Sequence, residues 1–319
     1  MWYTAKKNIF SHFRRYAMYV TRFTLPTEEQ EERFIAEKMR ENGGDLGYID
    51  NLYPCRIFPQ KRLEQIDLGK VTILYGSNGS GKSTLLNLIA ARLELNRIAP
   101  HNSGELFDRY AEACNYEMGY DDEGFRYRIP NGSRIITSDD VFDYMLAMRT
   151  ANEEISEKIE EERAFYNREV HSDVPNQLTG LDDYERFRKV HQARRKSVTR
   201  RQYIRQYAGK NLTLKSNGET ALQYFDAKLK NDTLYCLDEP ENSLAPALQQ
   251  KLAEMLTELV RYCGCQLIIA THSPFLLALP DAWILDLDST PVREKNWWEL
   301  ENTRAYFAFF EKHRSKFLR

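Results

Sequence analysis

One stretch of the chain, residues 71–84, constrains its fold more than any other. It begins with Val-Thr-Ile-Leu-Tyr, an apolar and β-branched run that predicts a short buried strand. The next residues fit the G-x-x-x-x-G-K-[ST] pattern of the phosphate-binding loop, and a run with helical spacing follows them. Strand, loop and helix therefore occur in the order that this motif requires. We expect a nucleoside triphosphate to bind here.

The residue types of this loop suit a triphosphate. Glycine lets backbone N–H groups converge on phosphate oxygens at positions where a Cβ would intervene. Lys82 can reach the β- and γ-phosphates, and the hydroxyl of Ser83 can bind Mg²⁺. The N-terminus of the following helix adds partial positive charge beneath the phosphates. The predicted nucleotide-binding residues are Gly76, Ser77, Asn78, Gly79, Ser80, Gly81, Lys82, Ser83 and Thr84.

A second apolar strand, predicted at residues 233–238, ends in two carboxylates. Asp238 is placed to hold Mg²⁺ together with Ser83, in the role called Walker B. Glu239 follows at the carboxyl edge of the strand, where it can polarise a water that attacks the γ-phosphate. Downstream of a phosphate-binding loop, this pair favours a hydrolytic site over a strand that merely ends in an acidic turn.

A third strand is predicted at residues 266–271, and His272 follows it. In parallel α/β sheets ligands bind at the carboxyl edge of the strands, so His272 can hydrogen-bond the γ-phosphate and report whether ATP is intact. The predicted catalytic residues are Lys82, Glu239 and His272.

Composition bounds the class of protein. A chain of 319 residues, 42% of them hydrophobic, can bury one large core, or one core with a satellite subdomain. A formal charge of −2 argues against a globally basic nucleic-acid coat and leaves a local basic patch open. The five cysteines have scattered spacing, which favours a reduced intracellular protein. The sequence has no 18-residue apolar run and no signal-peptide core, so we expect a cytoplasmic protein without a transmembrane helix.

Charge is sorted along the middle of the chain. Residues 153–162 hold six glutamates, whereas residues 186–210 hold ten lysines or arginines and no aspartate or glutamate. Both stretches have helical spacing. We therefore predict three parts: an N-terminal part of the nucleotide-binding core at 1–149, an inserted charged helical subdomain at 150–210 and a C-terminal part of the core at 211–319.

The basic stretch, predicted as one helix from Arg186 to Arg205, has two interpretations. It is either a solvated face that pairs with the acidic helix, or a surface that meets the phosphate backbone of a nucleic acid. Interleaved aromatic residues suit nucleic acid, but they suit a core stripe equally well.

Weaker patterns predict further elements. Residues 16–25 and 53–58 are rich in strand formers. Residues 125–129 and 133–137 alternate as strands, and the Pro-Asn-Gly turn between them predicts a hairpin. A helix is expected at 141–149.

The segment Ser216-Asn-Gly-Glu precedes the Walker B strand and opens an amphipathic helix. Taken alone, this segment is typical of a turn with a helix cap. Its place in the series of motifs gives it a second interpretation, which depends on a resemblance.

The motifs, in this order, resemble those of the ATP-binding-cassette ATPases, and among them the soluble, non-transporter heads of chromosome-maintenance and recombination-repair proteins. The nearest likeness is to small stand-alone bacterial predicted ATPases. It covers residues 53–90 and 212–319 and is carried by Gly-Ser-Asn-Gly-Ser-Gly-Lys-Ser-Thr, Leu-Asp-Glu-Pro-Glu-Asn, Ala-Thr-His-Ser-Pro and Trp-Trp-Glu-Leu-Glu. The resemblance implies an α/β P-loop NTPase fold of ABC-ATPase type: a mixed sheet flanked by helices, with an inserted helical subdomain.

The resemblance also implies a composite site. ATP with Mg²⁺ on the P-loop of one cassette is closed off by the signature motif of a second cassette in a head-to-tail dimer. Ser216 and Gly218 then act in trans on the γ-phosphate, and Ser243 and Leu244 lie in the loop that crosses the dimer interface. The signature departs from the family pattern, because Lys-Ser-Asn-Gly-Glu replaces Leu-Ser-Gly-Gly-Gln. The stretch 136–140 also lacks the lid glutamine of the family.

Three functions follow as hypotheses. The leading one is an ATPase that dimerises on ATP and couples turnover to a protein effector, with nucleic-acid processing or anti-phage (antiviral) defence as a family-level expectation. The alternative is a slowly hydrolysing, nucleotide-gated scaffold or sensor that holds an effector. The third is the ATPase subunit of a membrane transporter, which the missing lid glutamine and the long charged insertion disfavour.

Overall fold

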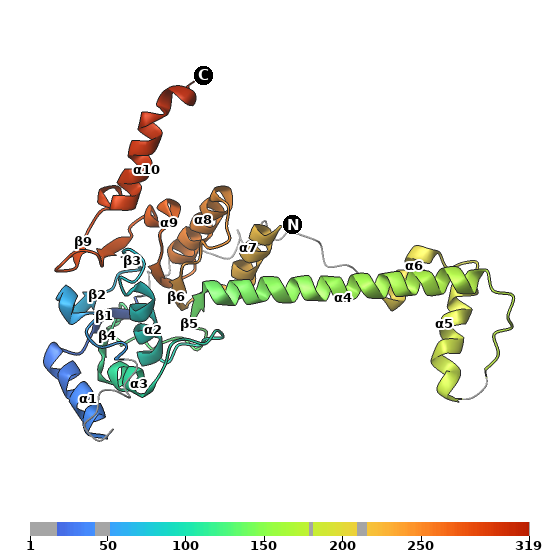
Figure 1. Ribbon diagram of the computed structural model, residues 1–319, viewed down its shortest axis with the longest axis horizontal. Helices are drawn as coiled ribbons and strands as arrows, with labels where there is room; N and C mark the ends of the chain where they lie inside the picture. The colour runs from blue at the N-terminus through green and yellow to red at the C-terminus, as the bar shows by residue number, and fades with distance from the viewer. Residues whose placement is uncertain (1–17, 42–51, 179–180, 209–215, 319) are drawn as a thin grey trace. The chain divides into compact units, whose positions relative to one another are not determined.

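The computed structural model describes residues 18–41, 52–178, 181–208 and 216–318 (Figure 1). These residues form two compact units, which are described separately. The first unit contains the chain up to residue 141 and again from residue 221, and the second contains residues 142–220. The described residues include no helix that is long and apolar enough to cross a membrane.

The centre of the first unit is a six-stranded sheet. Its strands lie in the order β5 (Arg134–Thr137), β6 (Leu234–Asp238), β7 (Gln266–Ala270), β3 (Val71–Tyr75), β8 (Trp283–Asp286) and β9 (Arg293–Glu294). The first five are parallel, and β9 is antiparallel to β8. All five residues of β3 and of β7 are buried, as expected for continuous apolar strands covered on both faces.

The parallel order brings three sequence motifs to one edge of this sheet. The P-loop follows β3, the Walker B carboxylates end β6, and His272 comes just after β7. Because β6, β7 and β3 are neighbours, their carboxyl ends lie side by side. Thr137, at the end of β5, lies opposite Asp238 in the register. Residues 136–140, which lack the lid glutamine of the family, therefore also lie at this edge.

A smaller antiparallel sheet completes the first unit, with the order β2 (Gln65–Asp67), β1 (Val20–Thr24) and β4 (Asn115–Met118). The fully buried side chain of Gln266 joins the two sheets. Its Oε1 accepts from the N–H groups of Tyr19 and Val20 at 2.9 and 3.0 Å, and its Nε2 donates to the carbonyl of Val20 at 2.7 Å. A buried amide that uses both ends in this way fixes the register of β1.

Helices cover the sheets. They are α1 (Glu28–Glu41), α2 (Lys82–Arg92), α3 (Glu105–Ala113), α8 (Pro246–Tyr262) and α9 (Pro274–Leu277), and α10 (Glu301–Lys312) is a further helix of this unit. Leu85, Leu88 and Ile89 of α2 share one hydrophobic cluster with inward-facing residues of the central strands. Leu252 and Leu256 of α8 are likewise fully buried. The apolar spacing that predicted α2 is therefore satisfied by the sheet, against which α8 also buries its apolar face.

Helix α10 differs from the others because its aromatic residues are not covered. The helix begins where the N–H of Asn302 donates to the hydroxyl of Tyr75 at 3.2 Å, and it leaves the sheet from there (Figure 1). Tyr306, Phe307, Phe309 and Phe310 are each more than half exposed.

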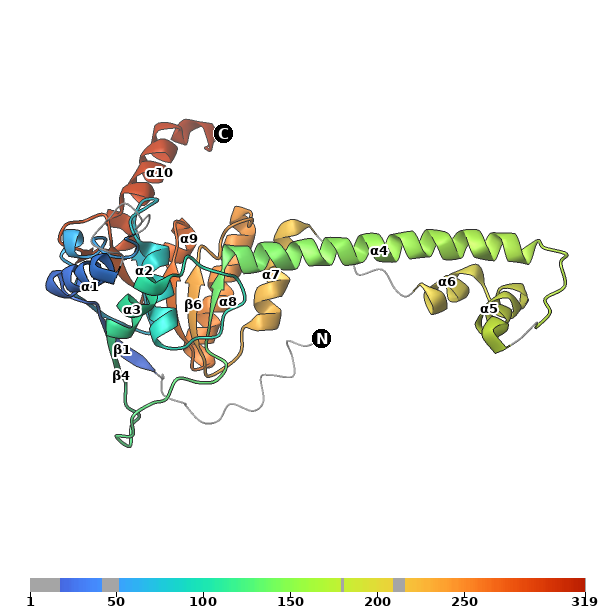
Figure 2. The same ribbon diagram turned by 60° about the horizontal axis from the view of Figure 1, so that its bottom comes forward.

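The second unit is helical. It contains most of α4 (Ser138–Val170), a single continuous helix (Figure 2), together with α5 (Tyr184–Arg194), α6 (Arg200–Tyr207) and the first turn of α7 (Asn217–Lys228). Short 3₁₀ turns across both units are η3 (Pro59–Lys61), η4 (Leu181–Asp183), η5 (Trp297–Glu299) and η6 (Arg314–Lys316).

The structure corrects four expectations. The predicted hairpin is wrong: residues 125–129 form no strand, and β5 pairs in parallel with β6. Residues 53–58 form turns instead of a strand. The helix expected at 141–149 is part of the much longer α4. The single basic helix is wrong, because residues 195–199 separate α5 from α6.

Candidate nucleotide-binding site

The P-loop connects β3 to α2 through a backbone that requires glycine. Gly79 and Gly81 have φ angles of 82° and 97°, in the left-handed region that side chains disfavour. At Gly76 a Cβ would lie 2.5 Å from the hydroxyl oxygen of Ser80. The loop has therefore turned tightly on itself, as a cradle of backbone N–H groups must.

Lys82 is 5% exposed, and its ammonium group lies against the loop. Its Nζ donates to the carbonyls of Gly76 and Ser77 at 2.8 and 3.0 Å. Burial lowers the pKa of Lys82, and the negative charges of Glu239 and Asp238 oppose that shift. A phosphate beside this group would exchange carbonyl contacts for charged ones, which are stronger.

Ser83 and Asp238 meet across the space between α2 and β6. The Oγ of Ser83 donates to Oδ1 of Asp238 at 3.0 Å. Burial raises the pKa of Asp238 to about 6; the hydrogen bond from Ser83 lowers it, and the charge of Glu239 raises it further. Asp238 forms no ion pair with another described residue. A cation bound beside it would stabilise the charged form of its carboxylate, because opposite charges attract.

Glu239 leaves β6 in a strained backbone conformation, with a φ of 48°. Its N–H donates to the carbonyl of Ala270 at 2.9 Å, and its Oε2 accepts from Nδ2 of Asn242 at 2.9 Å. The other oxygen, Oε1, lies 3.9 Å from Nε2 of His272. The two predicted catalytic side chains therefore face each other, too far apart for a direct hydrogen bond.

His272 is held for hydrogen bonding in its neutral form. Burial and the nearby ammonium of Lys82 lower its pKa, against the opposing charge of Glu239. Its Nε2 is buried and has no hydrogen bond within the described part of the chain. The ring packs edge-on against Tyr75 at 6.4 Å between centroids. A neutral imidazole with a free nitrogen can bind a phosphate oxygen without carrying a charge.

The residues present fit ATP with Mg²⁺. The hydroxyl of Ser80 and Nε2 of His272 are buried polar atoms without partners in the described residues, so a group that hydrogen-bonds them would stabilise the site. Ser83 and Asp238 supply the oxygen ligands that Mg²⁺ prefers. The described residues contain no group of three or more His, Cys, Asp or Glu side chains that could hold a metal ion.

Two side chains at this edge were missed by the sequence analysis. Asp288, two residues after β8, accepts from the N–H of Ser77 at 2.6 Å and from its hydroxyl at 2.8 Å. Glu241, two residues after Glu239, is buried and accepts from the loop of His272. A carboxylate just beyond a parallel strand was the available signal for Asp288.

Tyr53 also belongs to the surroundings of the P-loop. It hydrogen-bonds Thr84 and Asn87 of α2, and burial raises its pKa. Its ring stacks on that of Phe107, with the ring centroids 5.9 Å apart. Thr84, which is predicted to contact nucleotide, therefore also forms a hydrogen bond with Tyr53.

The signature residues Ser216 and Gly218 lie in the second unit. The hydroxyl of Ser216 accepts from the N–H of Glu219 at 3.3 Å, and Oε2 of Glu219 accepts from the N–H of Ser216 at 3.1 Å. This reciprocal pair is a capping box at the start of α7. Lys215, the first signature residue, lies outside the described residues. Action of Ser216 and Gly218 in trans stays a prediction.

The fold and the order of the motifs along one sheet edge define this chain as a P-loop nucleoside-triphosphate-binding protein. Residues 71–278, more than half of the chain, match the family described as "AAA domain, putative AbiEii toxin, Type IV TA system". The chain belongs to this family.

One curated relative matches over a short stretch. The cytochrome c biogenesis ATP-binding export protein CcmA of Mesorhizobium japonicum is 43% identical over 53 residues, which is 16% of this chain. The match spans about a quarter of that relative, 26% of its length.

Solved structures with a similar fold include the Smc head domain from Pyrococcus furiosus, with an extended coiled coil and bound to the C-terminal domain of ScpA. It is 14% identical, with coverage of 78% of this chain and 95% of that one and a TM-score of 0.37. The dimeric post-hydrolysis state of the ATP-binding cassette MJ0796 bound to ADP and Pi is 16% identical, with coverage of 73% and 90% and a TM-score of 0.33. CbiO1 from Clostridium perfringens is 18% identical, with coverage of 80% and 88% and a TM-score of 0.32. Each likeness concerns the fold alone.

Proposed function

We propose that this chain hydrolyses ATP to ADP and phosphate as a dimerising ABC-type ATPase. The observation that carries the proposal is the meeting of five side chains at one sheet edge: Lys82 and Ser83 of the P-loop, Asp238 bonded to Ser83, and Glu239 facing His272 at 3.9 Å. They come from three separate segments of the chain. This combination provides charge neutralisation, metal binding and water positioning together.

Each side chain has a role that follows from its surroundings. Mg²⁺ held at this site would supply neutralisation of the negative charge that develops in the reaction. Lys82 holds the phosphates, and Ser83 and Asp238 supply the metal ligands. Glu239 orients the attacking water through Oε1, the oxygen that Asn242 does not bind. His272 contacts the γ-phosphate through Nε2 and keeps it aligned.

The test compares ATP turnover of the wild type with that of Glu239→Gln in Mg²⁺. We expect steady hydrolysis by the wild type and loss of turnover in the variant, with nucleotide binding retained. Wild-type turnover no faster than that of Glu239→Gln would overturn the proposal.

A head-to-tail dimer is the state in which we propose that hydrolysis occurs, with Ser216 and Gly218 of one copy completing the site of the other. Light scattering of Glu239→Gln with ATP should give a dimer. A monomer at saturating ATP would contradict the composite site.

A slowly hydrolysing sensor is the second candidate, and the signature favours it. The hydroxyl of Ser216 is already engaged in the capping box with Glu219, so binding a phosphate would cost part of that contact. Stable ATP-bound dimers with turnover far below one per minute would favour this candidate. Co-purification with an integral membrane protein would instead revive the transporter-subunit hypothesis, to which the name of the export relative also points.

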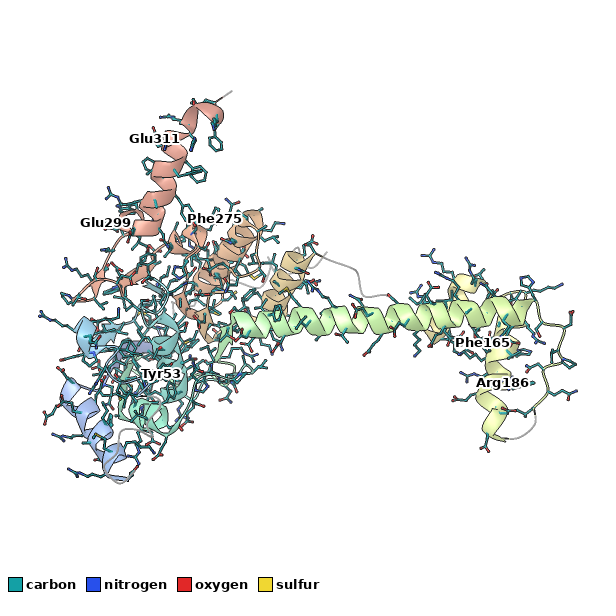
Figure 3. All side chains as sticks on the ribbon, viewed as in Figure 1. Tyr53, Phe165, Arg186, Phe275, Glu299 and Glu311 are labelled. Carbon is teal, nitrogen blue, oxygen red and sulfur yellow. The ribbon has the colours of Figure 1, made fainter. Side chains whose placement is uncertain are left out.

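The partner that turnover serves is proposed to be a protein effector, with nucleic acid as a second ligand of the helical unit. Lys189 and Arg194 pair with Glu162 and Glu169 of α4. Other cations of this stretch are exposed and form no ion pair among the described residues: Arg186 (Figure 3), Arg188, Arg195, Lys196, Arg200, Arg201 and Arg205. The two paired residues fit a face that pairs with the acidic helix, and the exposed cations are the ones that we propose for a nucleic-acid surface. The family description favours a role in defence.

A further inference from the structure

The buried carboxylate of Glu241 binds the loop that carries His272. Its Oε1 accepts from the hydroxyl of Thr271 at 2.6 Å and from the backbone N–H groups of His272 and Ser273 at 2.7 and 3.0 Å. Glu241 is 8% exposed, and its Oε2 has no hydrogen bond among the described residues. Hydrogen bonds to a carboxylate are about twice as strong as neutral ones. Three donors from consecutive residues on one oxygen fix the path of this loop.

A second side chain holds the same loop. The hydroxyl of Ser273 donates to Oε1 of Gln249 at 2.7 Å, and Nε2 of Gln249 donates to the carbonyl of Leu244 at 2.9 Å. The N–H of Leu244 in turn donates to the carbonyl of Glu241 at 3.0 Å. The amide of Gln249, on α8, therefore bridges the loop of His272 and the segment that follows the Walker B strand.

Apart from these two contacts to its loop, the imidazole of His272 has few contacts that hold it in place. Its Nε2 has no partner within the described chain, and its ring contact with Tyr75 is an edge-on one. The position of the imidazole therefore depends on the backbone of residues 271–273. That backbone is set by Glu241 and Gln249.

From this geometry we infer that Glu241 and Gln249 are positioning residues for His272, and that they link it mechanically to residues 243–245. The inference rests on the proposed function where it concerns turnover. A misplacement of about 1 Å at a reacting group can cost roughly a hundredfold in rate, so a fixed loop matters.

The link has a consequence for regulation. Ser243 adopts a φ of 68°, a strained conformation for a residue with a side chain. If a second copy docks on residues 243–245, a shift of the Leu244 carbonyl passes through Gln249 to Ser273. The approach of a partner would thus adjust His272 without touching it.

Hydrogen exchange of backbone amides tests the contacts directly and does not require activity. In Glu241→Ala we expect the amides of residues 272 and 273 to exchange about 10- to 100-fold faster, the range that corresponds to loss of a charged hydrogen bond. Amides of residues 267–269 in β7 should not change, which excludes general unfolding. Glu241→Gln, which keeps one acceptor oxygen, should restore most of the protection.

The matched controls for this experiment lie on the exposed face of α8. Glu254→Ala removes an exposed carboxylate, and Gln250→Ala removes the exposed amide next to Gln249. Neither should change exchange at residues 272 and 273. Gln249→Ala should accelerate exchange at residue 273, and it carries the test if Glu241→Ala fails to fold. Unchanged exchange in Gln249→Ala and in a folded Glu241→Ala would overturn the inference.

Kinetics then separates positioning from general support. Glu241→Ala should lower kcat about 10- to 100-fold and leave KM within about twofold, because the binding residues of the P-loop are untouched. In a His272→Ala background the same substitution should lower kcat no further, since its effect passes through His272. Losses that multiply would contradict positioning. An inactive wild type would refute the proposed function, and the exchange experiment would still decide this inference.

Discussion

Two carboxylates at the carboxyl edge of the main sheet, Asp238 and Glu241, and two in the helical unit, Glu162 and Glu169, are satisfied in opposite ways. At the sheet edge, Asp238 accepts from a serine hydroxyl, and Glu241 accepts from a hydroxyl and two backbone N–H groups. In the helical unit, Glu162 is bound by the ammonium of Lys189, and Glu169 by the guanidinium of Arg194.

This difference in partners distinguishes carboxylates that could bind a metal ion from carboxylates that hold helices together. A carboxylate that is already paired with a cation has little negative field left for another, so Glu162 and Glu169 hold helices together. Neutral donors satisfy a carboxylate without cancelling its charge. In the proposed function Asp238 is therefore available to Mg²⁺, and the metal would offset the burial that raises the pKa of Asp238 to about 6.

The largest effect is expected from replacing Lys82, which lies at the sheet edge. Lys82→Ala removes the ammonium that binds the phosphates, so we expect ATP binding and ATP-driven dimerisation to be lost together, at least about a hundredfold in affinity. Isothermal titration calorimetry and light scattering measure the two effects. Lys251→Ala, on the exposed face of α8, is the control. Dimerisation by Lys82→Ala in ATP would show that the helical unit, and not the sheet edge, drives assembly.

Glu239→Gln should separate binding from chemistry. The amide keeps the size of the side chain but cannot polarise water, so kcat should fall at least about a hundredfold while the Kd for ATP stays within a few fold. A phosphate-release assay and nucleotide titration measure both quantities. Parallel losses in kcat and affinity would assign Glu239 a binding role instead.

Lys189→Met tests the structural side of the comparison. Glu162 would then remain buried with only the hydroxyl of Tyr203, at 3.4 Å, and we expect a loss of about 1–3 kcal/mol in local stability. Urea unfolding and hydrogen exchange confined to α5 and α6 measure it. Arg188→Met, its exposed neighbour, is the control. A fall in ATP turnover without local destabilisation would contradict the division of roles.

The smallest effect is expected for the exposed cations of α6. Arg201 and Arg205 lie one turn apart and therefore share a face. If this face binds nucleic acid, replacing both by glutamate should weaken binding of a fluorescent oligonucleotide and reduce the slope of log K against log salt by about 2. Binding that is absent in the wild type, or unchanged in the variant, would restrict these residues to a solvated face.

Local patterns were sufficient for much of the cassette. The strands β3, β6 and β7 match the predicted segments within one residue, and α2 follows the P-loop as predicted, because continuous apolar runs and helical spacing are local signals. The hairpin at 125–137 was wrong for the same reason. Residues 134–137 alternate well enough for any strand, and their partner, β6, lies about a hundred residues away in the sequence.

The sequence by itself determined the P-loop, the Walker B carboxylates and His272, since each belongs to a short run of consecutive residues that can be recognised without the fold. Only the tertiary structure showed that Asp288 accepts a hydrogen bond from Ser77 and that Glu241 accepts one from the backbone of His272. Those contacts join segments more than thirty residues apart in the chain, in one case more than two hundred. Pairing across a sheet edge depends on strand order, which no local pattern encodes.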